Sequence, residues 1–93
     1  MIQFQVFETA EFARQLAALP QSYRRVIQTK LGEQIYPHLK QSPYFGSHIR
    51  KLRDYQPETW RYRVGDYRLF YRIDDKERIV KIISVDHRKD SYR

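Results

Sequence analysis

The chain of 93 residues contains no cysteine and only three glycines. Without cysteine it can form no disulfide framework, no thiolate zinc site and no cysteine nucleophile. This absence is typical of proteins from a reducing compartment. The sequence shows neither a glycine-rich phosphate loop nor a Ser-His-Asp arrangement, so two common kinds of active site find no support in it.

Long apolar runs are also missing. The N-terminal segment, MIQFQVFETAEF, lacks the basic leader and the apolar stretch of a signal peptide. No segment approaches the roughly 18 apolar residues that a membrane helix needs. We therefore expect a cytoplasmic protein without membrane contact, formed by a single domain over residues 1–93 with one small core.

Positive charge is present in excess. Eighteen lysines and arginines against eleven acidic residues give a formal net charge of +7. Residues 1–48 carry five basic and three acidic side chains, whereas residues 49–93 carry thirteen and eight. Such an excess favours a polyanionic partner, either nucleic acid or an acidic protein, although many small domains are basic for solubility alone.

The N-terminal half should form one strand and a helical hairpin. Alternation of apolar and polar residues predicts a strand over residues 2–7. Thr9 suits the cap of a first helix, which buries Phe12 and Leu16. A second helix should begin at Pro20. Its expected apolar stripe consists of Tyr23, Val26, Ile27, Leu31 and Ile35.

The middle of the chain contains the signals that end the second helix. Pro37 should stop it near Ile35 or Tyr36, because proline removes a helical hydrogen bond and its ring clashes with the preceding turn. Residues 38–48 then form a loop, punctuated by Pro43 and Gly46. Residues 49–53 are a short basic stretch that could be extended.

Three strands should complete the domain, over residues 59–64, 67–73 and 78–86. Gly65-Asp66 and residues 74–77 supply the turns between them. The last strand is rich in β-branched residues and should lie inside the sheet. The predicted order is β-α-α-β-β-β, an α+β fold with a small, mainly antiparallel sheet and a helical hairpin packed on it.

Residues 60–72, WRYRVGDYRLFYR, interleave arginines with aromatic rings. Strand alternation places Arg61 and Arg63 on one face of their strand, and Arg68 and Arg72 on one face of the next. We expect the neighbouring Trp60, Tyr62, Tyr67 and Tyr71 to lie in the core. An arginine cluster without its own counterions is the usual form of a phosphate site, because guanidinium groups match phosphate oxygens. The alternative is an ordinary solvated sheet face.

The hairpin residues WRYRVGDYRLFY, 60–71, resemble the central signature of the RelE toxins, in the RelE/ParE superfamily of bacterial toxin–antitoxin systems. ISVDHRKDSY, residues 83–92, is similar to the closing strand of that family and its HR-x-x-x-Y tail. Lys51-Leu52 resembles the Lys-Leu step before the second strand. The predicted order of elements agrees with the family over the whole chain.

The resemblance implies an endoribonuclease that cuts messenger RNA, typically in the ribosomal A site, needs no cofactor and is inhibited by an antitoxin. The positions that match the family's active site are Arg61, Arg63, Arg68, Arg88 and Tyr92, with His87 where many members also have histidine. Additional RNA-binding residues are expected at Lys51, Arg53, Arg72 and Lys89. No metal site is expected, because His38 and His48 have no carboxylate at metal-ligand spacing.

The best-known members have lysines where this chain has Arg61 and Arg63. Arginine stays protonated and is a poor general base, so these side chains should hold the scissile phosphate. His87 titrates near neutrality and is the candidate for base or acid, while Tyr92 could stack on a base or transfer a proton. Attack by the RNA 2′-hydroxyl would leave a 2′,3′-cyclic phosphate and a free 5′-hydroxyl.

Two other functions stay open at this point. The ParE branch shares the fold but poisons DNA gyrase, and a basic domain could bind RNA without cutting it. The alternating arginines and the HR-x-x-x-Y tail favour the nuclease. The antitoxin implied by the resemblance should be an acidic segment that folds on binding and either covers the arginines or displaces a helix.

Overall fold

The computed structural model describes residues 3–87 and contains one five-stranded sheet in the order β1-β5-β4-β3-β2. The strands are β1 (Gln5–Glu8), β2 (Ile49–Lys51), β3 (Trp60–Val64), β4 (Tyr67–Asp74) and β5 (Ile79–His87). β1 runs parallel to β5, and the other neighbours are antiparallel. The predicted α+β fold and the interior position of the last strand are confirmed.

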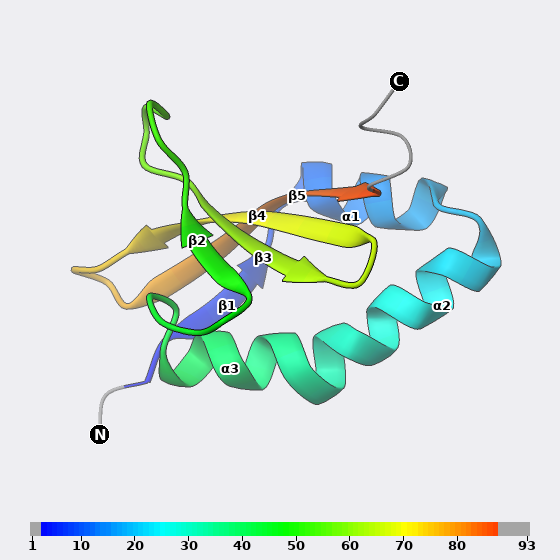
Figure 1. Ribbon diagram of the computed structural model, residues 1–93, viewed down its shortest axis with the longest axis horizontal. Coiled ribbons are helices and arrows are strands. Elements are labelled where there is room, and N and C mark those ends of the chain that lie inside the picture. The colour runs from blue at the N-terminus through cyan, green and yellow to red at the C-terminus, as the bar shows by residue number, and fades with distance from the viewer. Residues whose placement is uncertain (1–2, 88–93) are drawn as a thin grey trace.

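A helical hairpin covers one face of this sheet. The first helix, α1 (Ala10–Ala18), begins after Thr9, whose Oγ1 accepts a hydrogen bond from the N–H of Phe12 at 3.2 Å and confirms the predicted cap. The second helical segment consists of α2 (Gln21–Lys30), the π-helical turn η1 (Leu31–Ile35) and α3 (Tyr36–Gln41). Figure 1 shows α2 and α3 running below the strands as one continuous body.

The expectation that Pro37 ends the second helix is wrong. In η1 the N–H of Tyr36 donates to the carbonyl of Leu31, five residues earlier, so the turn before the proline is wider than an α-helical turn. The wider turn relieves the clash between the proline ring and the preceding carbonyls that normally breaks a helix. The helix therefore continues to Gln41, and the loop before β2 is shorter than predicted.

The core lies between the second helical segment and one face of the sheet. Residues four apart line the buried side of the helix: Ile27, Leu31, Ile35 and Leu39. They meet Tyr62, Leu69, Tyr71, Val80 and Ile82 from the strands. Each large apolar side chain buried in this way contributes about 1.5–3 kcal/mol. Tyr23 and Val26 were predicted to belong to this stripe but are 39% and 50% exposed.

The far end of β5 is covered by α1. β1 pairs with β5 only as far as Ile82, which would leave the edge of β5 open beyond that point. There Gln15 Oε1 accepts a hydrogen bond from the N–H of Val85 at 2.8 Å, so a side chain of α1 satisfies the strand edge. No helix within residues 3–87 combines the length and the apolar character that crossing a membrane requires.

Candidate nucleic-acid interface

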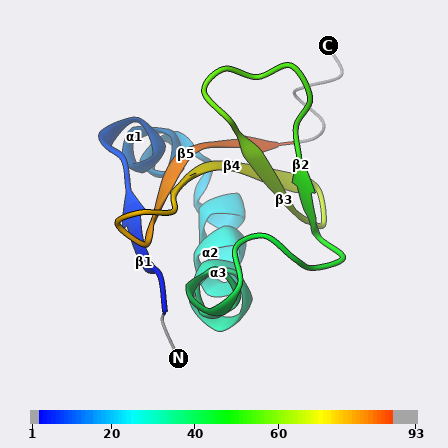
Figure 2. The same ribbon diagram turned by 90° about the vertical axis from the view of Figure 1, so that its left-hand side faces the viewer.

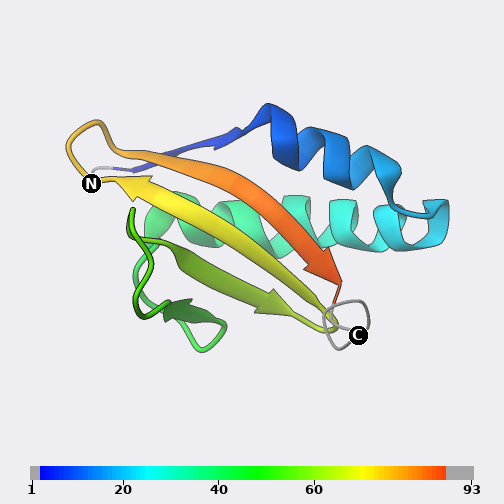
Figure 3. The same ribbon diagram turned by 90° about the horizontal axis from the view of Figure 1, so that it is seen from above.

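The sheet face turned away from α2 and α3, which we call the open face, carries the arginines predicted to bind phosphate. Along β3 and β4, Tyr62 and Leu69 point into the core, so that Arg61, Arg63 and Arg68 lie on the opposite side. Figure 2 shows α2 and α3 on one side of the sheet and the loop between β2 and β3 rising on the other. Figure 3 looks onto the open face, with α2 and α3 behind the strands.

Strand pairing brings arginines from β2, β3 and β4 together on the open face. Arg50 lies directly opposite Arg61, and Arg63 lies directly opposite Arg68. Side chains in such cross-strand pairs are about 5 Å apart at their Cβ atoms. We call Arg50, Arg61, Arg63 and Arg68 the arginine cluster. The sequence did not single out Arg50, because the three-residue strand β2 is too short to show an alternating pattern.

The electrostatics of Arg61 reflect this crowding. Burial lowers the pKa of Arg61 from its ordinary value, and the charges of Arg50, Arg63 and Arg68 lower that pKa further. Within residues 3–87, the buried Nε atoms of Arg61 and Arg68 have no hydrogen-bond partner. Leaving a buried donor unpaired costs about 1–3 kcal/mol. An anion bound at the arginine cluster would offset the repulsion among these charges.

The cluster contains one internal counterion. Arg68 Nη2 lies 3.0 Å from Asp86 Oδ2, and the two side chains are 30% and 39% exposed. The expectation of a cluster without internal counterions is therefore wrong for Arg68. Within the described part of the chain, Arg50, Arg61 and Arg63 form no ion pair with a carboxylate, so the cluster keeps a strong positive excess.

A β-bulge in β5 decides which side chains reach the cluster. Phe70 pairs with Ser84, but the next residue, Tyr71, pairs with Ile82, so Ile83 is an extra residue in β5. Without this bulge, strict alternation from Ile82 would point Ser84 and Asp86 towards the helices. The extra residue reverses the alternation and turns Asp86 to the open face.

The same bulge turns His87 into the domain. His87 is only 7% exposed and pairs with Tyr67 across the ladder. Its ring stacks on Tyr23 at 4.9 Å between centroids and lies 4.8 Å from the ring of Tyr67. The structure therefore does not bring the ring of His87 together with the arginines, and the role of this histidine in proton transfer stays a prediction.

The other predicted RNA-binding residues lie around the cluster or away from it. Arg72 is exposed on the open face, two residues beyond Phe70 in β4. Lys51 has the opposite orientation to Arg50 and forms an ion pair with Glu58 at 2.9 Å. Arg53 belongs to the β2–β3 loop. Arg88, Lys89 and Tyr92 lie outside the described residues, as does Ile2 of the predicted first strand.

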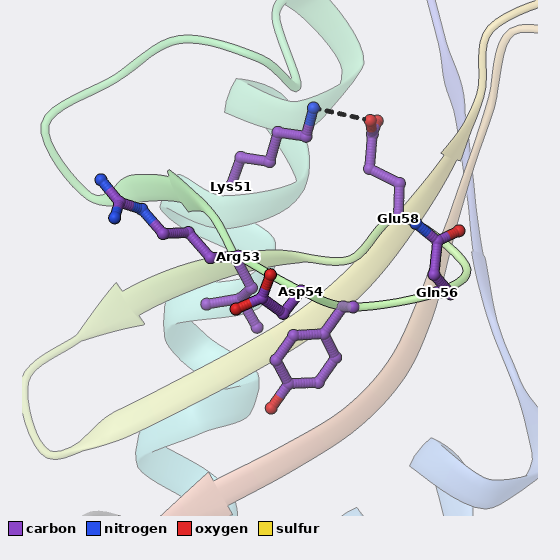
Figure 4. A pocket seen from close by; sticks show the side chains of 7 residues that line it. Lys51, Arg53, Asp54, Gln56 and Glu58 are labelled. Carbon is purple, nitrogen blue, oxygen red and sulfur yellow. Dashed lines mark ion pairs between the residues drawn. The ribbon is translucent and has the colours of Figure 1, made fainter.

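The β2–β3 loop encloses an open hollow of about 550 Å³. Its lining residues are Lys51, Leu52, Arg53, Asp54, Tyr55, Gln56 and Glu58. Figure 4 shows the ion pair between Lys51 and Glu58 on one side of this hollow, with the side chain of Arg53 extending away from it. Acidic and basic groups are mixed there, so the hollow lacks the uniform positive charge of the arginine cluster.

Within residues 3–87, no group of three or more histidine, aspartate or glutamate side chains could hold a metal ion.

Comparisons with known proteins agree on one family. The family model described as "ParE toxin of type II toxin-antitoxin system, parDE" matches residues 6–92. A curated relative, Toxin RelG of Mycobacterium tuberculosis, is 50% identical over 44 residues, which cover 47% of this chain and 51% of that protein. The match thus spans about half the length of this relative.

Solved structures extend the likeness over nearly the whole chain. The toxin–antitoxin complex RelBE2 from Mycobacterium tuberculosis contains a chain with 30% identity and a TM-score of 0.72, with 94% of this chain and 100% of that chain covered. The archaeal RelE–RelB complex from Pyrococcus horikoshii has 23% identity and a TM-score of 0.68, covering 95% and 97%. Because its identity is only 23%, the similarity to the archaeal structure concerns the fold alone.

Proposed function

Because this chain belongs to the RelE/ParE toxins of type II toxin–antitoxin systems, we propose that it is an endoribonuclease that cuts messenger RNA in the ribosomal A site. The observation that carries the proposal is the arginine cluster on the open face. Arginines from three strands meet there, and within residues 3–87 only one of them is neutralised by a carboxylate. Such a surface suits the phosphate backbone of a nucleic acid.

The cluster can lower the barrier to cleavage without a metal. The RNA 2′-hydroxyl attacks the adjacent phosphorus, and negative charge builds up on the non-bridging oxygens. In this proposal Arg61 and Arg63 hold those oxygens, and their permanent charge stabilises the transition state. DNA lacks the 2′-hydroxyl and would not be cut. The proposal also includes Arg88 and Tyr92 as active-site residues, as the resemblance to the RelE toxins implies.

We also propose that an antitoxin inhibits the protein, either by covering the arginine cluster on the open face or by displacing a helix. The RelBE2 structure is that of a toxin–antitoxin complex. For this chain the net charge of +7 and the arginine cluster favour an acidic segment that folds on binding. Full inhibition by an antitoxin that leaves the arginine cluster accessible to solvent and displaces no helix would contradict this part of the proposal.

The decisive experiment incubates the protein with translating ribosomes and maps the 5′ ends of the messenger RNA. Cuts in phase with codons support the nuclease. Intact messages together with trapped gyrase–DNA complexes would instead support a ParE-like poison, which the name of the matching family model keeps as the second candidate. If the protein binds RNA but neither cuts messages nor traps gyrase on DNA, it is an RNA-binding module without catalysis.

A further inference from the structure

We propose that Asp86 is the general base that takes the proton from the RNA 2′-hydroxyl. The inference deepens the proposed function and rests on it, because it assigns the proton transfer at the same site. It starts from the position of the Asp86 carboxylate, which lies on the open face and is held by Arg68 at 3.0 Å.

The β-bulge in β5 is what places the Asp86 carboxylate on the open face, since regular strand alternation would not. The extra residue Ile83 reverses the alternation of β5, so that Asp86 pairs with Arg68 on the open face. Bulges are frequent next to active sites, where they redirect a side chain. Regular pairing would have buried a carboxylate against the helices, at a large desolvation cost.

Among the side chains that neighbour Asp86, neither the arginines nor His87 suits this role. The arginines are permanently protonated, and His87 stacks on Tyr23 and lies against the ring of Tyr67 on the covered side. Asp74 also points to the open face by alternation along β4, but it is six residues from Arg68. At about 3.3 Å per residue this separation is roughly 20 Å, which is too far for a shared phosphate.

The pairing with Arg68 suits the role of a base. One guanidinium group can fix the carboxylate through Nη2 and still face the same phosphate as Arg63, its direct cross-strand neighbour. Asp86 is 39% exposed, so a substrate hydroxyl can reach the oxygen that Arg68 does not hold. Arg68 is then a positioning residue for the base as well as a contact for the phosphate.

The step balances without a cofactor. Asp86 accepts the 2′-hydroxyl proton while the 2′-oxygen forms a bond to phosphorus. The bond from phosphorus to the 5′-oxygen breaks, and that oxygen takes a proton from water. Asp86 returns its proton to the resulting hydroxide, which leaves a 2′,3′-cyclic phosphate, a 5′-hydroxyl and an unchanged enzyme.

A competing role for Asp86 makes the opposite prediction. If the carboxylate only screens the repulsion between Arg63 and Arg68, its removal leaves more positive charge for RNA and cleavage stays equal or becomes faster. If it is the base, its removal leaves RNA binding equal or stronger, because a negative charge is lost, but slows the chemical step by about 100-fold or more.

The test uses the full-length protein carrying Asp86→Asn, in which the amide oxygen can still accept the hydrogen bond from Arg68. Asp74→Asn is the matched control, since it removes the same charge from the same face. Single-turnover cleavage of messenger RNA on programmed ribosomes is measured at neutral pH. Affinity is measured with RNA that carries a 2′-deoxy nucleotide at the cleavage site.

We expect Asp86→Asn to bind the deoxy-substituted RNA at least as tightly as the wild type and to cleave at least about 100-fold more slowly. Asp86→Glu should recover part of the rate, and Asp74→Asn should behave as the wild type. Retained RNA binding by Asp86→Asn shows that the variant is folded.

Cleavage by Asp86→Asn at the wild-type rate or faster overturns the assignment of the base and leaves the nuclease proposal intact. If the wild-type protein cuts no message, both the assignment of Asp86 as the base and the nuclease proposal are overturned.

Discussion

Arg63 of β3 and Arg68 of β4 lie directly opposite each other, one residue pair away from the turn that joins the two strands. The two-residue loop Gly65-Asp66 fixes this register, and Gly65 supplies the positive φ of 55° that such a turn needs. Like charges in direct cross-strand pairs destabilise a sheet. The sheet therefore keeps an unfavourable pair next to its tightest turn, as expected for a binding surface and not for a structural one.

Replacing Arg63 by glutamine should make the protein more stable and less active. Removal of the repulsion with Arg68 should raise the free energy of unfolding by about 0.5 kcal/mol, measured by urea denaturation at low salt. The gain should shrink at high salt, because exposed charges are then screened. Arg25→Gln, a change at an exposed helical position, is the control, and equal effects of the two variants would contradict the account.

Gly46 and Gly32 should respond in opposite ways to alanine. A Cβ at Gly46 would clash with Cε1 of His38, and the φ of 154° disfavours any side chain. His38 bridges the hydroxyl of Tyr62, at 2.9 Å, and the carbonyl of Phe45, at 2.7 Å. Gly46→Ala would displace this ring and should cost about 2 kcal/mol or more.

Gly32 is the matched control for this prediction. It lies in η1 with no atom within 4 Å of the added Cβ. Gly32→Ala should stabilise the helix by about 0.5–1 kcal/mol. Thermal unfolding of both variants tests the pair, and a Gly46→Ala protein as stable as the wild type would show that His38 is not held as described.

Much of this architecture follows from local signals. The Thr9 cap, the Gly65-Asp66 turn and the opposite faces of Tyr62 and Arg61 are set by neighbours in sequence, so the pattern predicts them. The π-helical turn before Pro37 and the bulge at Ile83 depend on tertiary packing. Because the bulge exchanges the faces of Asp86 and His87, strand alternation alone does not show which of the two side chains lies beside the arginines.

Alkaline pH should destabilise the fold partly through Tyr44. Burial and the hydrogen bond that its hydroxyl donates to Asp75 Oδ1, at 2.5 Å, raise the pKa of Tyr44 to about 12. In the unfolded chain a tyrosine has a pKa of about 10. The folded state therefore holds this proton more tightly, and its contribution to stability is complete below about pH 10 and is lost as pH rises to about 12.

Unfolding by urea at several pH values between 9 and 12 measures this effect. The midpoint for Tyr44→Phe should fall less steeply with pH than that of the wild type. Tyr55→Phe, at a ring that is 54% exposed, serves as the control. Parallel pH profiles for the wild type and Tyr44→Phe would remove Tyr44 as a cause of alkaline unfolding.

The central claim is that the arginine cluster holds the RNA that is cut, and message cleavage by two triple variants tests it most directly. One variant carries Arg61→Ala, Arg63→Ala and Arg68→Ala, and the other carries Arg14→Ala, Arg25→Ala and Lys30→Ala, which remove the same charge from exposed helical positions. In a translating extract that responds to the wild type, we predict that the first variant cuts no message and that the second cuts within about threefold of the wild-type rate, since only general electrostatic attraction is reduced. Cleavage by the first variant at the wild-type rate, or an equal loss in both, would contradict the account.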